Sequence, residues 1–396
     1  MAASPSHKGS HLRLLIILGS LTMFPAMCTD MYLTAFPTIA HQFGVHIADL
    51  QLTLTSFLIG TGLGQIVYGP LSDRFGRKRP ILYGLVIFLV ATVMCGMTTT
   101  LTGMVFWRFF QAIGGSAAVV IARAIARDRF SGAELSRTMS GMSMVFLISP
   151  VLGPSVGSLI LHWASWPWVF YVLILFGIYC FVAVLTLEES HAPEKRNQHG
   201  FVRTAITYGT ILRSSDFRAA SVITIGAGFA TFSYVASSPA VLMGSYGVSK
   251  SAFGYIFGII AIGLVVSNRI NMKLVARYGV RKMLRGFTSV QSVAAIFLLA
   301  ATIAKAPLWL LILTIIFTFG VAPGLGGNTM TLAMQPFPNS AGAASALIGL
   351  IQALASAFIA ALLATAHEGA LVKMGAAMFV GAIICFVQVR RIKTAA

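Results

Sequence analysis

Residues 50–107 read LQLTLTSFLIGTGLGQIVYGPLS, then DRFGRKR, then PILYGLVIFLVATVMCGMTTTLTGMVFW. The first run (50–72) and the last run (80–107) contain no Asp, Glu, Lys or Arg, whereas the segment between them holds one acid and four bases. A helix that spans a bilayer needs roughly 20 apolar residues, so each run is long enough for one. The stretch therefore predicts membrane-spanning helices joined by a short, basic loop.

The same pattern continues along the whole chain. Further uncharged runs lie at 138–187, 219–249, 286–304 and 306–367. The longest two each have room for two spans, with polar or proline-containing breaks at 162–167 and 335–339. We therefore expect an all-α polytopic membrane protein with twelve transmembrane helices. Their expected positions are 12–40, 49–68, 80–98, 101–122, 138–161, 167–187, 218–240, 250–270, 284–304, 308–332, 342–366 and 371–390.

Composition excludes the soluble classes of protein. The chain has 396 residues, of which 57% are hydrophobic and only 10% are charged, whereas a soluble domain is nearer a quarter charged. The net charge of +18 would suggest nucleic acid as a partner of a soluble protein. Here the charges stand in short clusters between apolar runs, which is typical of membrane-protein loops.

The basic residues also predict the orientation. If the N-terminus is cytoplasmic, 24 of the 28 Lys and Arg residues fall on the cytoplasmic side, and only Lys250, Lys305 and Lys373 fall outside. The remaining one, Arg108, lies within a predicted helix. Cytoplasmic loops carry the excess of Lys and Arg in membrane proteins, so we expect both termini in the cytoplasm.

Six predicted helices precede the most polar segment of the chain and six follow it. We expect a first six-helix bundle at 1–187, a cytoplasmic linker at 188–217 and a second bundle at 218–396. Short basic loops stand at matching places in the two halves, with GRK at 76–78 and GVRK at 279–282. Two similar halves around a midplane site are the layout of secondary transporters.

Several motifs in the first half resemble one family. GPLSDRFGRKR (69–79) closely resembles the loop 2–3 signature of the major facilitator superfamily, and TDMYLTAFP (29–37) and ARAIARD (122–128) resemble its Bcr/CflA drug-resistance subfamily. The resemblance implies the major facilitator fold and a proton/drug antiporter of the bacterial inner membrane. It also implies a cytoplasmic latch that joins the two halves. The implied latch residues are Gly69, Asp73, Arg74, Gly76, Arg77 and Asp128.

Two helix motifs fit the same resemblance. RFFQAIGG (108–115) is similar to the superfamily's helix 4 motif, and an Arg inside a membrane costs about 2.5–3.5 kcal/mol or more, so Arg108 should face a wet cavity or a counter-charge. A structural ion pair or an outward-pointing side chain are the alternatives. SPVLGPSVG (149–157) in helix 5 resembles the motif of the superfamily's antiporters, with a purely structural kink as the alternative. Its motif residues are Pro150, Gly153, Pro154 and Gly157.

Asp30 is the one acid inside a predicted helix, since every other Asp or Glu falls in a loop or at a helix end. A carboxyl group taken out of water holds its proton more readily, because the charged form loses hydration. It can then exchange protons at ordinary pH. We expect Asp30 and Arg108 to couple transport to protons. The alternative is that Asp30 caps the outer end of a shorter first helix.

The candidate cavity helices 1, 4, 7 and 10 are rich in Met and aromatic side chains, which adapt to amphipathic ligands. The chain lacks GxSxG, HExxH and GxxxxGK[ST] motifs and metal-ligand spacings. We therefore expect no enzyme, cofactor or metal, but a monomer in the lipid bilayer that exports chloramphenicol- or bicyclomycin-like compounds against protons. A proton-coupled importer of a small nutrient is the alternative. The expected cavity residues are Met27, Met31, Tyr32, Gln111, Phe232, Tyr234 and Phe317.

Overall fold

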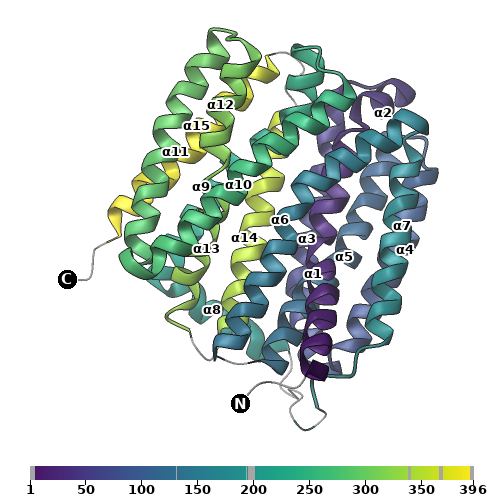
Figure 1. Cartoon of the computed structure of the whole chain (residues 1–396), viewed down its shortest axis with the longest axis vertical. Coiled ribbons are helices and arrows are strands. Elements are labelled where there is room, and N and C mark those ends of the chain that lie inside the picture. Colours follow the sequence, from purple (N-terminus) through teal and green to yellow (C-terminus); the bar gives the residue numbers. More distant parts are fainter. Residues whose placement is uncertain are drawn as a thin grey trace.

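The computed structural model describes residues 5–130, 132–192, 194, 201–337, 340–364 and 369–392, and these residues form helices and no strand (Figure 1). Twelve helical segments of this part of the chain are long and apolar enough to cross a membrane, which confirms the predicted twelve-span, all-α fold. The helices are α1 (Pro5–Leu33), α2 (Phe36–Phe43), α3 (Gln51–Phe75), α4 (Lys78–Met97), α5 (Leu101–Arg129), α6 (Gly132–Trp163), α7 (Pro167–Leu185), α8 (Phe201–Arg213), α9 (Ser215–Ser238), α10 (Lys250–Tyr278), α11 (Val280–Ile303), α12 (Leu308–Phe319), α13 (Ala322–Met334), α14 (Ala341–Ala364) and α15 (Ala370–Arg391), with a 3-10 turn η1 (Ile47–Leu50) before α3 and a π-helical segment η3 (Pro239–Ser245) after α9.

Two of the predicted helices are interrupted. The predicted first helix is α1 followed by the short α2, with a turn at residues 34–35, and Pro37 stands in the first turn of α2. The predicted tenth helix is α12 followed by α13, with a break at residues 320–321, and Pro323 stands in the first turn of α13. Proline has no N–H to donate to the preceding turn, so it fits a helix start better than a helix interior.

The spans pack in two similar groups. In the first group α1 packs against α6, and α5 packs against α3 and α4; in the second, α9 packs against α14 and α15, and α11 against α15. Two seams join the groups: α3 packs on α14, and α10 packs on α6. The helix α8 lies within the segment predicted as a linker. The domain boundaries at 1–187, 188–217 and 218–396 stay a prediction.

Matching glycines end the second span of each group. Gly76 ends α3 with a φ of +88°, and Gly279 ends α10 with a φ of +78°. This left-handed region is strained for residues with a Cβ atom. The next helix starts directly after each of these glycines, so the two groups share the same sharp turn between their second and third spans.

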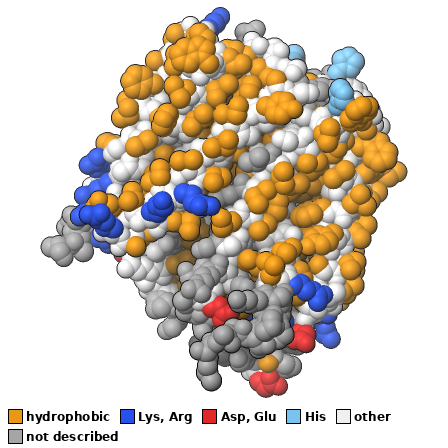
Figure 2. Space-filling model, viewed as in Figure 1, with side chains coloured by type: hydrophobic (Ala, Val, Ile, Leu, Met, Phe, Trp, Pro, Cys, Tyr) orange, Lys and Arg blue, Asp and Glu red, His pale blue; other side chains and the backbone are white. Residues whose placement is uncertain are grey.

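The surface agrees with a membrane-embedded body. Hydrophobic side chains cover much of the face in Figure 2, whereas the Lys and Arg side chains on it lie mainly in two groups, one at the left edge near mid-height and one at the lower right. In the same view α1 starts near the bottom and α15 ends at the left edge (Figure 1). On this face the positive charge therefore lies mainly toward the side of the molecule where the two ends of the chain also lie.

Candidate functional site

Asp30 lies in the last turn of α1 and is buried, with a relative exposure of 6%. Its carboxylate oxygen Oδ2 accepts a hydrogen bond of 3.4 Å from the Ser149 hydroxyl of α6. The alternative that Asp30 caps the outer end of a shorter first helix is therefore excluded. The carboxyl group instead belongs to the seam between α1 and α6.

The glycines of the helix 5 motif make this seam narrow. A Cβ atom on Gly153 would lie 2.5 Å from the Cβ of Asp30, and one on Gly157 would lie 2.7 Å from the Met31 carbonyl oxygen. Pro150 and Pro154 also lie inside α6. The two glycines let the backbone of α6 approach α1 at the turn that carries Asp30, which is a common use of small residues between membrane helices.

A Gly157→Ala protein should be destabilised by about 1–3 kcal/mol, because the added methyl group meets backbone atoms that cannot rotate away. Thermal unfolding of the purified protein measures this effect. Gly258→Ala in α10 is the control, because a Cβ there meets nothing within 4 Å. A similar loss of thermal stability in both variants would contradict the close packing of α6 against α1 at Gly157.

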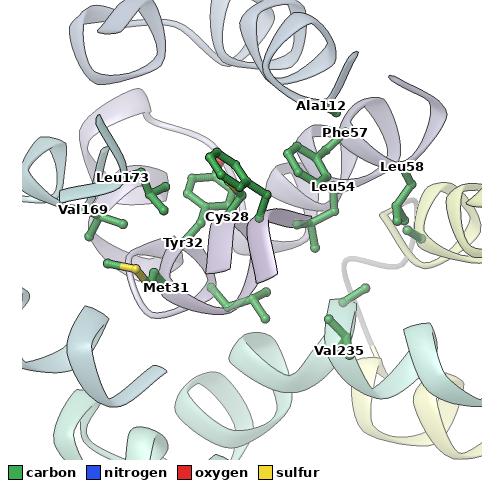
Figure 3. Close-up of a cluster of buried hydrophobic side chains, with 14 of the residues drawn as sticks. Cys28, Met31, Tyr32, Leu54, Phe57, Leu58, Ala112, Val169, Leu173 and Val235 are labelled. Carbon is green, nitrogen blue, oxygen red and sulfur yellow. The ribbon is translucent and has the colours of Figure 1, made fainter. Parts of the chain in front are cut away.

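Arg108 is fully buried inside the first group of helices. Its guanidinium lies over the Tyr32 ring at 4.6 Å and over the Phe57 ring at 4.2 Å. Its Nη1 donates to the Cys28 carbonyl at 3.1 Å and to Gln111 Oε1 at 2.7 Å. Figure 3 shows Tyr32 between Phe57 on one side and the α7 residues on the other. Arg108 is thus held by rings and by a backbone carbonyl of α1.

The side chains of Arg108 and Asp30, which we expect to couple transport to protons, do not contact each other. In the described part of the chain no ion pair or hydrogen bond joins the two side chains. Cys28 and Asp30 are two residues apart on α1 and so point to different sides of the helix. Arg108 therefore touches the Asp30 helix on the side away from α6.

The expected cavity residues do not share one environment. Tyr32 and Gln111 lie inside the first group, where Tyr32 accepts a hydrogen bond from Thr53 at 3.0 Å and Gln111 donates to Thr92 at 2.9 Å. Because their polar atoms are used within one bundle, the expectation that both line a central cavity is not met. Met31 is buried at the α1–α6 seam, and Met27 and Phe232 are half-buried against the same core.

Tyr234 and Phe317 have opposite surroundings. Tyr234 is fully buried between the rings of Phe257 and Phe319, its hydroxyl has no hydrogen-bond partner among the described residues, and the charge of Asp30 acts on it. Phe317 is 53% exposed, on one side of α12 with Trp309 and Leu313, which are exposed too. This side points away from the helix core, so the prediction that Phe317 lines the cavity is wrong.

The predicted latch residues Asp73, Arg77 and Asp128 do meet. Arg77 Nη1 binds Asp73 Oδ1 at 2.5 Å, and its Nε and Nη2 bind the two oxygens of Asp128 at 2.8 and 3.2 Å. Burial lowers the pKa of Arg77, but its hydrogen bonds to Asp128 and Asp73 outweigh burial and leave the pKa above its ordinary value. Arg74 lies over the Phe75 ring instead, and a Cβ on Gly69 would meet nothing within 4 Å.

The ion pairs of the latch stay within the first group, which corrects the expectation that they bridge the two halves. They join the end of α3, the start of α4 and the end of α5. Glu189 completes the network, because its carboxylate accepts from the Arg77 and Lys78 backbone N–H groups at 2.9 and 3.1 Å. No sequence motif marked Glu189, whose role depends on the chain returning to this end after α7. On α8, burial and then the charge of Asp73 raise the pKa of Tyr208, so α8 lies beside the latch.

Asp128→Asn should destabilise the protein more than Asp73→Asn. The Asp128 side chain is 17% exposed and accepts two hydrogen bonds from Arg77, whereas that of Asp73 is 52% exposed and accepts one. We expect losses of about 2 kcal/mol and about 0.5 kcal/mol, because exposed pairs are worth less than buried ones. The two thermal midpoints test this, and equal midpoints would contradict the ranking.

Comparison with known proteins identifies relatives over nearly the full length. The chain is 32% identical to the uncharacterized MFS-type transporter YdgK of Bacillus subtilis, covering 97% of this chain and 96% of that protein. It is 30% identical to a bicyclomycin resistance protein homolog of Haemophilus influenzae, covering 89% and 88%. It is 29% identical to multidrug resistance protein D of Escherichia coli, also covering 89% and 88%. The resemblance to Bcr/CflA-type transporters is confirmed by these relatives.

Solved structures share the fold at low sequence identity. The proton:xylose symporter XylE bound to 6-bromo-6-deoxy-D-glucose superposes with a TM-score of 0.76 at 14% identity, covering 97% of this chain and 95% of that one. The twelve apolar spans found in the described part of the chain, together with the bacterial relatives, make this a multi-pass protein of the inner membrane. The model of the Major Facilitator Superfamily matches residues 18–360, and the chain belongs to that superfamily.

Proposed function

We propose that this chain exports small amphipathic antimicrobial compounds from the cytoplasm in exchange for protons. The observation that carries the proposal is Asp30, a carboxyl group buried where α1 meets the glycines and prolines of α6. The names of relatives support the choice of cargo, since they include bicyclomycin, chloramphenicol and multidrug resistance proteins. Chloramphenicol-like and bicyclomycin-like compounds are the first candidates.

The proposed exchange depends on alternating access of Asp30 to the two aqueous sides. When the outer side is open, Asp30 takes a proton and the bound compound leaves. When the inner side is open, binding of a new compound favours release of that proton to the cytoplasm. A proton and a compound thus compete for one state of the protein, and this competition makes the exchange obligatory. Ser149 keeps the carboxylate hydrogen-bonded while it is charged.

The proton gradient is large enough for this work. One proton that crosses about 100 mV and one pH unit releases about 3.7 kcal/mol. At about 1.4 kcal/mol per tenfold, this sustains a gradient of several hundred-fold for a neutral compound. The proposal therefore needs no nucleotide and no cofactor. We further propose that the protein works as a monomer with both termini in the cytoplasm.

Export by a pump-deficient bacterial host that expresses this chain tests the proposal. We expect at least a fourfold rise in the inhibitory concentration of chloramphenicol or bicyclomycin, which disappears when the proton gradient is collapsed. A host whose susceptibility stays unchanged for every neutral and charged antibiotic tested, but which takes up a nutrient, would overturn the proposal in favour of an importer.

A further inference from the structure

A groove of about 630 Å³ lies between α1 and α7. Leu12 and Ile16 line it from α1 and Val182 lines it from α7, and each of these side chains is about half exposed. The helix α7 also packs against α4 and lies at the edge of the bundle that is farther from the second group (Figure 1). The groove therefore faces the lipid and not the space between the two groups.

Aromatic rings close the inner end of the groove. Phe24 of α1 contacts Phe176 of α7, with ring centroids 4.9 Å apart. Tyr179 lines the groove and stacks on Phe176, with ring centroids 6.3 Å apart. From Tyr179 the groove follows α7 as far as Thr186, a length of about 10 Å at about 1.5 Å per residue. The groove thus ends at the ring pair and offers no path to Asp30.

The outer end of the groove is polar and positively charged. Arg13 lines it at the start of the first span, and Thr186 lines it directly after the end of α7. Lys78 brings a second positive charge to this end, because its ammonium group donates a hydrogen bond of 2.7 Å to the Leu185 carbonyl. The groove is therefore amphipathic, with its polar end at the membrane surface and its apolar end toward the middle of the membrane.

The acids that follow α7 are not partners of Arg13. The carboxylate of Glu189 accepts hydrogen bonds from backbone N–H groups of the turn between α3 and α4, and the carbonyl of Glu188 accepts one from Arg129. In the part of the chain that the structure describes, no ion pair joins either glutamate to Arg13. The guanidinium of Arg13 is thus available to an anion at the polar end of the groove.

We propose that this groove binds one anionic phospholipid, with a fatty acyl chain between α1 and α7 and the phosphate on Arg13. An acyl chain fills an apolar groove that water occupies poorly, and a guanidinium group binds phosphate through two parallel hydrogen bonds. Basic pockets between spans are a general recognition site for anionic head groups. The charges of Arg13 and Lys78 repel the ammonium of a zwitterionic head group, so they favour a lipid with a net negative charge. The inference holds whatever compound the protein transports.

Native mass spectrometry of the detergent-purified full-length protein tests the site. The protein is titrated separately with phosphatidylglycerol and with phosphatidylethanolamine of the same acyl chains, and the first binding constant of each lipid is measured. We expect phosphatidylglycerol to bind about fivefold more tightly, the effect of roughly 1 kcal/mol for an accessible ion pair. Arg13→Gln should bring the two binding constants within about twofold of each other, because the phosphate loses its partner. Glycerophosphoglycerol, the head group without acyl chains, should not displace phosphatidylglycerol at equal concentration.

Two further variants separate the groove from the charge. Ala183→Phe places a ring in the groove but keeps Arg13, so it should weaken the binding of both lipids. Arg277→Gln removes an exposed arginine from the end of α10 and should change neither binding constant. The site is refuted if the parent binds both lipids equally, or if Arg13→Gln or Ala183→Phe binds phosphatidylglycerol as tightly as the parent does. Displacement of phosphatidylglycerol by chloramphenicol would also overturn the inference, since the groove would then take the transported compound.

Discussion

An Asp30→Asn protein is expected to fold and insert normally but to lose export completely, with a fall of at least a hundredfold in the rate of proton-driven transport. The amide has the shape of the neutral carboxyl group and still accepts the hydrogen bond from Ser149. It has no proton to exchange, so the protein keeps one of its two states and cannot complete the cycle. Binding of a neutral compound should remain within threefold of the parent.

Proton release from the detergent-purified protein on addition of chloramphenicol measures this loss, together with resistance in cells. Ser149→Ala is the matched control, because it removes the hydrogen bond but keeps the titrating group; it should weaken export without abolishing it. If Asp30→Asn still releases protons and still confers resistance, Asp30 is not the coupling site and the exchange mechanism is wrong.

Arg108→Met is expected to reduce export at least tenfold while leaving the thermal midpoint of the protein unchanged or higher. Nε and Nη2 of Arg108 are buried without hydrogen-bond partners among the described residues, and each such donor costs about 1–3 kcal/mol. An apolar side chain of similar length removes this cost together with that of the buried charge. It loses the contacts with the two rings, worth about 2 kcal/mol each when desolvated, and the hydrogen bonds of Nη1 to the Cys28 carbonyl and to Gln111, so the gains and the losses nearly cancel.

Export should fall at least tenfold in Arg108→Met, because Arg108 holds the α1 carbonyl two residues before Asp30. Arg108→Lys keeps a buried charge but loses the planar group that lies between the rings, and its midpoint should fall below that of the parent. Differential scanning fluorimetry compares the three proteins. A midpoint for Arg108→Met well below that of Arg108→Lys would show that the ring contacts outweigh the cost of burying the charge.

The number and type of spans could be predicted from the sequence because they depend on local composition. Uncharged runs of sufficient length require helices in a bilayer whatever their neighbours. The same composition hides which face of a span points inward. In α12 nearly every residue is apolar, so nothing in the sequence distinguishes exposed Phe317 from buried Phe319. The prediction for Phe317 therefore failed, whereas Asp73, Arg77 and Asp128 do meet as the motif predicts.

Some partners of the charged side chains could likewise be predicted from the sequence, and others could not. Asp73 and Arg77 are four residues apart and could be paired from the motif, since the same helix end brings them together. Arg108 is held by a backbone carbonyl 80 positions earlier and by two rings on different helices. Any residue type has a carbonyl, so no pattern of side chains could mark Cys28 as that partner. Glu189 escaped prediction for a similar reason, because it binds backbone N–H groups.

The two seams between the groups, α3 on α14 and α6 on α10, have a consequence for the direction of transport. Each seam joins the second span of one group to the fifth span of the other. The two seams are therefore equivalent: exchanging the two groups of helices turns one seam into the other. A rocking motion that loosens both seams at one end tightens both at the other, and the two extreme positions should differ little in free energy. The direction of transport is then set by the gradients of proton and compound and not by the protein. In proteoliposomes, an outward-to-inward gradient of compound with no proton gradient should therefore drive protons backwards through the same path.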